Sequence, residues 1–235
     1  MILSKDCFLY DSCKKFKSGK CNLDDNQFCI KLFKLNYLYE ESLLSKKQRE
    51  YVALRIDADG TDREEFMRLK AIENSIEDFV QSGQSLYIFS NNCGNGKTAW
   101  SIRLMQAYLN AVWHKCDLSC KALFINVPRF LLELKNSISN KSDYIEHIRE
   151  NVLNADIVVW DEVATKAVTQ FEHEHLLSLI NGRIDSGKSQ IFTSNASPEN
   201  LRDVMGDRLY SRVINLSTVM EFRGADKRGL NQQGG

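Results

Sequence analysis

The stretch Asn91–Thr98 reads Asn-Asn-Cys-Gly-Asn-Gly-Lys-Thr and lies between a short apolar segment, 85–90, and a segment of helical periodicity that begins at residue 97. A loop that binds a polyphosphate needs backbone N–H groups curled around the anion, glycines where side chains would clash, a lysine for the terminal phosphates and a hydroxyl for Mg²⁺ at a helix N-terminus. This stretch supplies each of these, although Asn91 replaces the first glycine of the pattern G-x-x-x-x-G-K-[ST]. Asparagine tolerates left-handed backbone geometry better than most residues, so the loop can still form. The alternative is a glycine-rich turn that happens to contain a lysine, but the flanking strand and helix favour a polyphosphate-binding loop.

A second motif lies further along the chain, where the apolar segment Ile157–Trp160 is followed by Asp161 and Glu162. A carboxylate at the C-terminal end of a buried strand can hold the Mg²⁺ that bridges a nucleotide, and an adjacent carboxylate can deprotonate the attacking water. We therefore expect Asp161 to be the metal-side acid and Glu162 the general base. Without the polyphosphate-binding loop, the two acidic residues would be interpreted as a solvent-exposed turn after a buried strand. The residues predicted to bind the nucleotide are Asn92, Cys93, Gly94, Asn95, Gly96, Lys97, Thr98 and Asp161, of which Thr98 and Asp161 are the predicted Mg²⁺ ligands.

Short apolar segments alternate with helical segments through most of the chain. The expected strands are 85–90, 122–127, 157–160, 190–194 and 217–222, and the expected helices are 97–113, one that begins near 129, 172–185 and 199–214. Upstream of them, apolar residues recur at helical period from Thr61 to Gly83, and Thr61 with Glu64 has the spacing of a capping box. This alternation predicts an α/β fold, in which helices cover both faces of a mostly parallel sheet.

Two further groups of polar residues follow the later strands. Asn195 comes directly after the strand that ends in Thr193 and Ser194, where its amide would reach the same end of the sheet and hold the attacking water. Asparagine after a strand is also a common turn residue. Arg208 and Arg212 are four residues apart, so they share one helix face. An exposed arginine pair is usually solvated surface, but an arginine is also what a neighbouring subunit needs to stabilise the charge on a transferred phosphoryl group.

In this order, the motifs Gly94–Thr98, Val159–Glu162, Thr193–Asn195 and Asp207–Arg212 resemble those of the AAA+ ATPases of the DnaC/DnaI helicase-loader group, over roughly residues 65–235. The resemblance implies a P-loop NTPase fold with strand order 5-1-4-3-2. Only about twenty residues follow the last expected helix, which leaves too little chain for the α-helical lid of most AAA+ proteins. The loaders of this group are similar in lacking a full lid domain. The roles that the resemblance implies are Walker A for Lys97 and Thr98, Walker B for Asp161 and Glu162, sensor 1 for Asn195, and an arginine finger acting in trans for Arg212 or, less surely, Arg208.

The function that the resemblance implies is that of an ATP-dependent replicative helicase loader. Such a protein binds ATP, Mg²⁺ and single-stranded DNA, assembles into a ring or spiral, and delivers a hexameric helicase, with ATP hydrolysis that is weak and assembly-dependent. One alternative is an IstB-like transposition helper, which shares nearly the same ATPase core. Another is a P-loop kinase, although the Asp-Glu pair suits the activation of water better than transfer to an acceptor. Compactness and a cysteine-rich head are suggestive of a phage replication protein.

Four of the seven cysteines fall within the first 29 residues; they are Cys7, Cys13, Cys21 and Cys29. Four thiolates suit a tetrahedral zinc site or an iron–sulfur cluster, and a bound metal would stabilise a segment that has few apolar residues. The spacing lacks the C-x₂-C of common zinc modules, so zinc, an iron–sulfur cluster and unligated thiols all remain open. The resemblance implies a small zinc-bearing N-terminal domain that holds the helicase. We therefore divide the chain into a Cys-rich domain at 1–60 and an AAA+ ATPase domain at 61–235.

Composition excludes several other classes. In the 235 residues, 31 Lys and Arg balance 31 Asp and Glu, so the net charge of the protein cannot attract DNA. DNA binding would need a local basic patch on the surface. No apolar run approaches the roughly 20 residues that span a bilayer, and the N-terminus lacks the features of a secretory signal. We expect no membrane partner and a place in the cytoplasm, the reducing interior of a bacterial cell.

Overall fold

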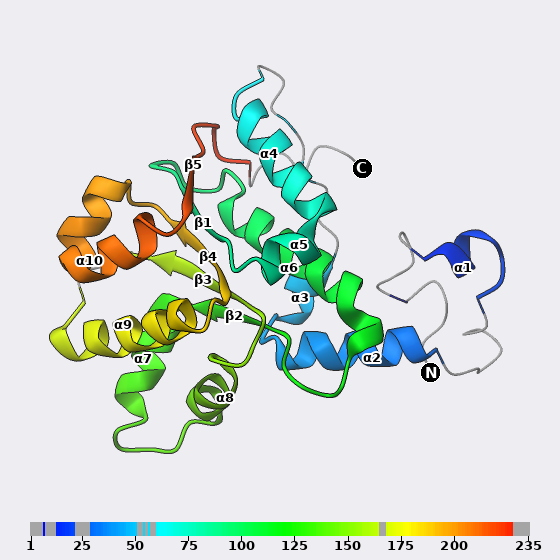
Figure 1. The fold of residues 1–235 in the computed structure, drawn as a ribbon, viewed down its shortest axis with the longest axis horizontal. Helices are drawn as coiled ribbons and strands as arrows, with labels where there is room; N and C mark the ends of the chain where they lie inside the picture. Colours follow the sequence, from blue (N-terminus) through cyan, green and yellow to red (C-terminus); the bar gives the residue numbers. More distant parts are fainter. Residues whose placement is uncertain are drawn as a thin grey trace.

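The computed structural model describes residues 7, 13–21, 29–50, 54, 56, 60–164 and 168–227. Its centre is a five-stranded sheet in which each pair of neighbouring strands is parallel (Figure 1). In spatial order the strands are β2 (Ala122–Asn126), β3 (Ile157–Val163), β4 (Ser189–Ser194), β1 (Ser85–Phe89) and β5 (Thr218–Glu221). This is the predicted order 5-1-4-3-2 read from the opposite edge, so the predicted AAA+ P-loop fold is confirmed.

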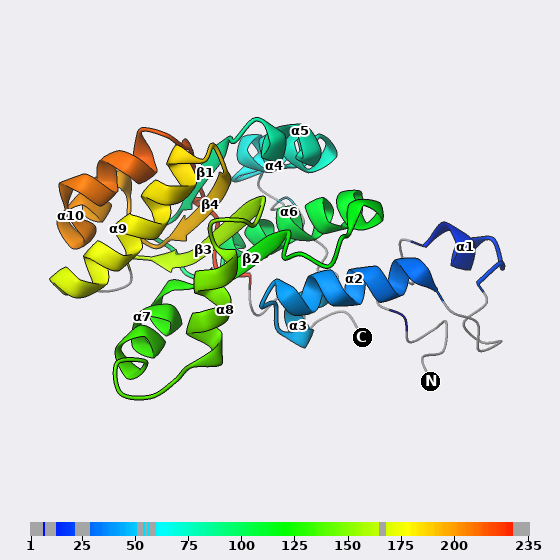
Figure 2. The ribbon, with the colours of Figure 1, turned by 60° about the horizontal axis from the view of Figure 1, so that its bottom comes forward.

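Helices form a layer on each side of the sheet (Figure 2). The helices are α1 (Lys14–Lys17), α2 (Ile30–Glu41), α3 (Lys46–Arg49), α4 (Arg63–Asn74), α5 (Ile76–Gln81), α6 (Lys97–Val112), the 3₁₀ turn η2 (Trp113–Lys115), α7 (Val127–Asn136), α8 (Asp143–Asn151), α9 (Gln170–Asp185) and α10 (Pro198–Ile214). Apolar residues of α2, α4, α5 and α6 share one hydrophobic core with the sheet, and those of α7, α8, α9 and α10 share a second core on the other face.

The alternation of side chains along β1 explains the two cores. Leu86 and Ile88 belong to the core under α6, whereas Tyr87 and Phe89 belong to the core under α9 and α10. Successive residues of a strand point to opposite faces, so a strand covered by helices on both sides is buried on both faces and mostly apolar. This is why the expected strands could be recognised as short, predominantly apolar segments.

The segment before β1 differs from its prediction. A single helix was expected between residues 61 and 83, but the helix breaks at Ser75, and α4 and α5 are separate. The predicted capping box of Thr61 and Glu64 is wrong. The residue that precedes α4 is Asp62, which has a left-handed φ of 61° and makes no capping hydrogen bond with its side chain. The carboxylate of Asp62 instead accepts hydrogen bonds from the backbone N–H groups of Arg223 and Gly224.

Helix α2 lies on the N-terminal side of the predicted division at residue 60. Its residues Leu35 and Leu38 are buried in the same core as Leu104 of α6. The division into 1–60 and 61–235 therefore remains a prediction about function, because α2 and α6 pack in one core. Among the described residues, no helix has both the length and the apolar character that crossing a bilayer requires.

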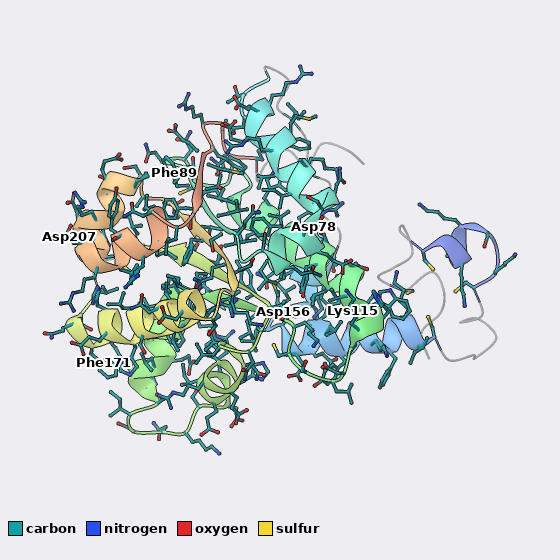
Figure 3. All side chains as sticks on the ribbon, in the orientation of Figure 1. Asp78, Phe89, Lys115, Asp156, Phe171 and Asp207 are labelled. Atoms are coloured by element: carbon teal, nitrogen blue, oxygen red, sulfur yellow. The ribbon has the colours of Figure 1, made fainter. Side chains whose placement is uncertain are left out.

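The parallel sheet brings the predicted functional residues to one edge. Phe89, which ends β1, and Asp156, which precedes β3, lie at opposite ends of the sheet (Figure 3). Because all strands run the same way, the carboxyl ends of β1, β3 and β4 share the edge at which Phe89 lies. This is the edge at which ligands bind in open parallel sheets.

Candidate nucleotide-binding site

The loop after β1 has the backbone geometry that a glycine-rich phosphate loop needs. Gly94 and Gly96 have φ angles of 74° and 105°, values that favour glycine, and Gly96 immediately precedes α6. A β-carbon on Gly94 would also clash with the carboxylate of Asp226. Asn91 does not adopt a positive φ, so the loop forms without the left-handed conformation that we had allowed for at this position.

Side chains of the loop hydrogen-bond within it. Lys97 Nζ donates to the carbonyl oxygen of Asn92 at 2.9 Å and to Asn95 Oδ1 at 3.3 Å. The buried Asn95 amide in turn donates to Ser90 Oγ. The ammonium group of Lys97 is therefore held inside the loop, in the position from which it reaches the terminal phosphates in a nucleotide-binding loop.

Thr98 and Asp161, the two predicted Mg²⁺ ligands, are in direct contact. Thr98 Oγ1 donates to Asp161 Oδ1 at 2.7 Å, and Thr193 Oγ1 donates to the same oxygen at 2.7 Å. Burial raises the pKa of Asp161, and the hydrogen bonds from Thr193 and Thr98 oppose this shift. A hydroxyl and a carboxylate are the oxygen ligands that Mg²⁺ prefers, so this pair fits the predicted cation.

Glu162 has an unusual backbone conformation next to Asp161. Its φ is 61°, and the register between β3 and β4 shifts between Trp160 and Val163. A left-handed conformation is costly for a residue with a side chain and is typically retained where a function needs it. The Glu162 backbone N–H donates to Thr193 Oγ1 at 3.1 Å, so Thr193 contacts both acidic residues.

Asn126 is a site residue that sequence reasoning missed. Its Nδ2 donates to Glu162 Oε2 at 3.1 Å and to Asp161 Oδ2 at 3.4 Å, while its Oδ1 caps α7 by accepting from the Arg129 backbone N–H. The available signal was the polar residue at the end of the apolar strand 122–127, since carboxyl ends of parallel strands meet at one edge.

The predicted motifs meet in a cavity of about 380 Å³. It is lined by Gly94–Ala99 of the loop and the start of α6, by Glu162 within the register shift, and by Thr193, Ser194 and Asn195 at the end of β4. Lys47 and Gln48 of α3 and Glu50 also line it, which the sequence had not indicated. Three residues predicted to bind the nucleotide are not among the lining residues: Asn92, Cys93 and Asp161. The Cys93 side chain is exposed, whereas Asp161 is buried and is joined to the cavity by its hydrogen bond with Thr98.

The two candidate arginine fingers lie outside this cavity. Arg208 and Arg212 are exposed on α10, beyond an interruption of the helix at Gly206, where φ is 80°. Asp207, next to Arg208, lies at the outer surface of the molecule (Figure 3). An arginine that acts in trans needs to be exposed, but its role there remains a prediction.

The N-terminal cysteines give no support to a metal site. Cys7, Cys13, Cys21 and Cys29 are all described, and within the described ranges no group of three or more His, Cys, Asp or Glu residues could hold a metal ion. Cys7, Cys13 and Cys29 are half-buried and pack against the core that contains α2 and α6. Packing of thiols as small apolar groups accounts for their burial without a metal.

Comparisons with known proteins agree with this geometry. The model of the bacterial DnaA ATPase domain family matches residues 69–218. No curated protein matches the sequence. The chain is similar in structure to the DnaC helicase loader, with a TM-score of 0.57 and 16% identity over 74% of this chain and 94% of that one.

A putative primosome component from Streptococcus pyogenes serotype M3 has a TM-score of 0.59 and 23% identity, over 82% of this chain and 98% of that one. The replication initiator DnaA bound to AMPPCP and single-stranded DNA has a TM-score of 0.55 and 18% identity, over 77% of this chain but only 51% of that one. These structural similarities establish a shared fold. The sequence match over residues 69–218, which is most of the chain, shows that the protein belongs to the family of the bacterial DnaA ATPase domain.

Proposed function

We propose that this protein is an ATP- and Mg²⁺-dependent ATPase that loads a replicative helicase. The observation that carries the nucleotide part is the 2.7 Å hydrogen bond between Thr98 Oγ1 and Asp161 Oδ1, which joins the buried Asp161 to the cavity that Thr98, Lys97 and Glu162 line. A hydroxyl and a buried carboxylate brought together at the end of a phosphate loop are the two protein ligands that a nucleotide-bound Mg²⁺ needs. The helicase part rests on the similarity to the DnaC helicase loader and to the primosome component.

In the proposed reaction the loop backbone binds the phosphates, and Lys97 exchanges its contacts with Asn92 and Asn95 for the terminal phosphate oxygens. Thr98 and Asp161 would hold the Mg²⁺, which when bound would neutralise negative charge on the phosphates. Glu162 accepts a proton from the attacking water.

The remaining groups of the proposed site act around the attacking water and the γ-phosphate. Asn195 orients that water from the end of β4. Arg212, or else Arg208, of a neighbouring copy stabilises the transferred charge. The proposed ring or spiral would bring that arginine to the cavity.

The contact between Asn126 and Glu162 supports the proposal that hydrolysis is weak until the protein assembles. One oxygen of the Glu162 carboxylate, Oε2, accepts from Asn126 Nδ2, so this hydrogen bond restrains the orientation of the proposed base. A neighbouring copy or a partner that rearranges Asn126 would release the carboxylate. Assembly would then increase hydrolysis without any change in the loop that binds ATP.

The partners of this ATPase are also part of the proposal. A hexameric helicase is the proposed cargo. Single-stranded DNA is the proposed nucleic-acid partner, which is supported by the similarity to the replication initiator DnaA bound to AMPPCP and single-stranded DNA. Residues 1–60 would hold the helicase and 61–235 would bind ATP, in the cytoplasm of a bacterial cell. Because the 31 basic and 31 acidic residues cancel, DNA binding must come from a local surface.

Two measurements test this function. Binding of a fluorescent ATP analogue in the presence of Mg²⁺, compared between the native protein and Lys97→Ala, tests the nucleotide site, and equal affinity would refute it. Purification from the native host with ATP or with ADP, followed by identification of co-purified proteins, tests the cargo. A hexameric helicase supports a loader, whereas a transposase instead of a helicase would refute it in favour of a transposition helper.

A further inference from the structure

Asp62 makes a contact that its position at the start of a helix does not explain. Its carboxylate accepts hydrogen bonds from two successive backbone N–H groups, that of Arg223 at 2.7 Å and that of Gly224 at 2.8 Å. The carboxylate is thus turned away from the N-terminus of α4, which it does not cap. Hydrogen bonds to an ionised carboxylate are stronger than those between neutral groups, so this is a firm attachment between segments more than 150 residues apart.

The segment that Asp62 binds, residues 222–227, runs along the phosphate loop, and we call it the strap. Asn92 Nδ2 of the loop donates to the carbonyl oxygens of Arg223 at 3.1 Å and Gly224 at 3.3 Å. These are the same two residues whose N–H groups bind Asp62. Asp62 therefore binds the N–H groups of this short piece of backbone, and Asn92 binds its carbonyl oxygens.

Two more contacts attach the strap to the loop. Lys227 N–H donates to the Gly94 carbonyl oxygen at 2.9 Å, and Asn95 Nδ2 donates to the Phe222 carbonyl oxygen at 3.4 Å. Together with those of Asn92, these contacts use side-chain amides and one carbonyl of the loop. None of these contacts uses a backbone N–H group of the loop, which is the group that a phosphate loop presents to the phosphates.

We propose that Asp62 is a positioning residue for nucleotide binding, which acts through the strap on the phosphate loop. This inference rests on the proposed function, since it concerns the same nucleotide site. The charge of Asp62 holds and polarises the backbone at Arg223 and Gly224, and the carbonyls of that backbone hold Asn92 in place. A loop already held in its binding conformation loses less conformational entropy when the nucleotide binds.

The proposal predicts that Asp62→Ala weakens nucleotide binding, although the hydrogen bonds of the Asp62 carboxylate go to the strap and not to the phosphate loop. We expect an affinity for a fluorescent ATP analogue with Mg²⁺ that is about tenfold lower, comparable to the loss of one charge-assisted hydrogen bond. Asp62→Asn, which keeps one acceptor oxygen, should lie between Asp62→Ala and the native protein. Glu64→Gln, at an exposed acidic residue in the first turn of α4, is the matched control and should bind normally.

A double-mutant cycle with Asn92→Ala separates positioning from a merely structural role. Because both residues act through the same backbone, Asp62→Ala should weaken binding much less in the Asn92→Ala protein than in the native one. Thermal unfolding without nucleotide is measured in parallel. If Asp62 only stabilised the fold, its loss would lower the melting temperature and leave the affinity of the folded protein unchanged.

Three results have distinct meanings. Weakened binding in Asp62→Ala with strong coupling to Asn92→Ala supports the proposal. Native affinity in folded Asp62→Ala, or independent effects of the two substitutions, overturns it while leaving the nucleotide site intact. Should Asp62→Ala not fold, the same comparison is made with Asp62→Asn. Failure of the native protein to bind the analogue would instead refute the proposed function.

Discussion

The amide of Asn126 donates to the carboxylate of Glu162 at 3.1 Å, across the carboxyl ends of β2 and β3. Glu162 is thus restrained by a neighbouring strand in addition to its left-handed backbone. A general base whose carboxylate is held by a neighbouring side chain has fewer orientations in which it can contact the attacking water. Asn126 therefore lies where it can limit hydrolysis without contacting the phosphate loop.

Asn126→Ser should raise the basal rate of hydrolysis severalfold at saturating ATP. Serine is too short to reach Glu162, but it remains a good helix N-cap, so α7 should keep its start. Phosphate release by the isolated chain at saturating ATP measures this effect. A rate equal to or lower than that of the native protein would show that the contact does not restrain the base.

Glu162→Gln should bind ATP with native affinity but hydrolyse it roughly 10²–10⁴-fold more slowly, as expected for the loss of a general base. Glutamine is nearly isosteric and keeps an acceptor oxygen for Asn126. Equilibrium binding and single-turnover phosphate release are measured on the same preparation. Undiminished turnover would remove Glu162 from this role.

Asp161→Asn should make the nucleotide-free protein more stable at neutral pH. Burial raises the pKa of Asp161, so the folded state binds its proton more tightly than the unfolded state does. Stability from this group is greatest at low pH and is lost as the pH rises through the folded-state pKa. As the pH rises from the ordinary pKa of an aspartate through the raised pKa of Asp161, the melting temperature of the native protein should therefore fall relative to that of Asp161→Asn.

The same substitution should abolish the extra stabilisation by ATP with Mg²⁺, because the carboxylate is a proposed metal ligand. Thermal unfolding with and without the nucleotide, across a pH series, measures both effects. Identical pH dependence of the two melting temperatures would show that ionisation of the buried Asp161 does not destabilise the native protein.

Arg212→Ala should impair hydrolysis only in the assembled protein, and it should be complemented by a different inactive variant. When Arg212→Ala and Glu162→Gln are mixed, some interfaces combine an intact Glu162 with an intact Arg212 from the neighbour. The mixture should therefore hydrolyse ATP faster than either variant alone. The same mixing with Arg208→Ala decides between the two arginines, and a mixture no faster than its components contradicts action in trans.

Much of the site could be predicted because the relevant signals are local. The loop with Gly94, Gly96 and Lys97 carries its own pattern, and the apolar strand before Asp161 marks where that residue must lie. Once the strands are parallel, their carboxyl ends share an edge, which brings Thr98 and Asp161 together over a separation of 63 residues.

The features that the sequence did not predict depend on backbone contacts, which have no characteristic sequence pattern. Asp62 binds the backbone N–H groups of Arg223 and Gly224, which almost any residue provides, so its role could not be predicted and the capping-box spacing of Thr61 misled. The break at Ser75 between α4 and α5 likewise has no proline or glycine to mark it.

The cysteine prediction shows the limit of counting ligands. Four thiols satisfy the number that a zinc site needs, but ligation also requires that their sulfur atoms converge. In the part of the chain that the structure describes, Cys7, Cys13 and Cys29 pack against the apolar core and form no metal-binding group. Spacing alone could not distinguish these arrangements.

The most direct test of the account is the Mg²⁺ dependence of ATP-analogue binding in the native protein and in Thr98→Ala. If Thr98 and Asp161 hold one cation against the phosphates, removing Mg²⁺ should weaken binding to the native protein at least tenfold, and Thr98→Ala should be nearly insensitive to its removal. Titrations of AMPPCP with Mg²⁺ or with EDTA, followed by calorimetry, give both affinities. Binding by the native protein that is independent of Mg²⁺, or full Mg²⁺ dependence in Thr98→Ala, would contradict it.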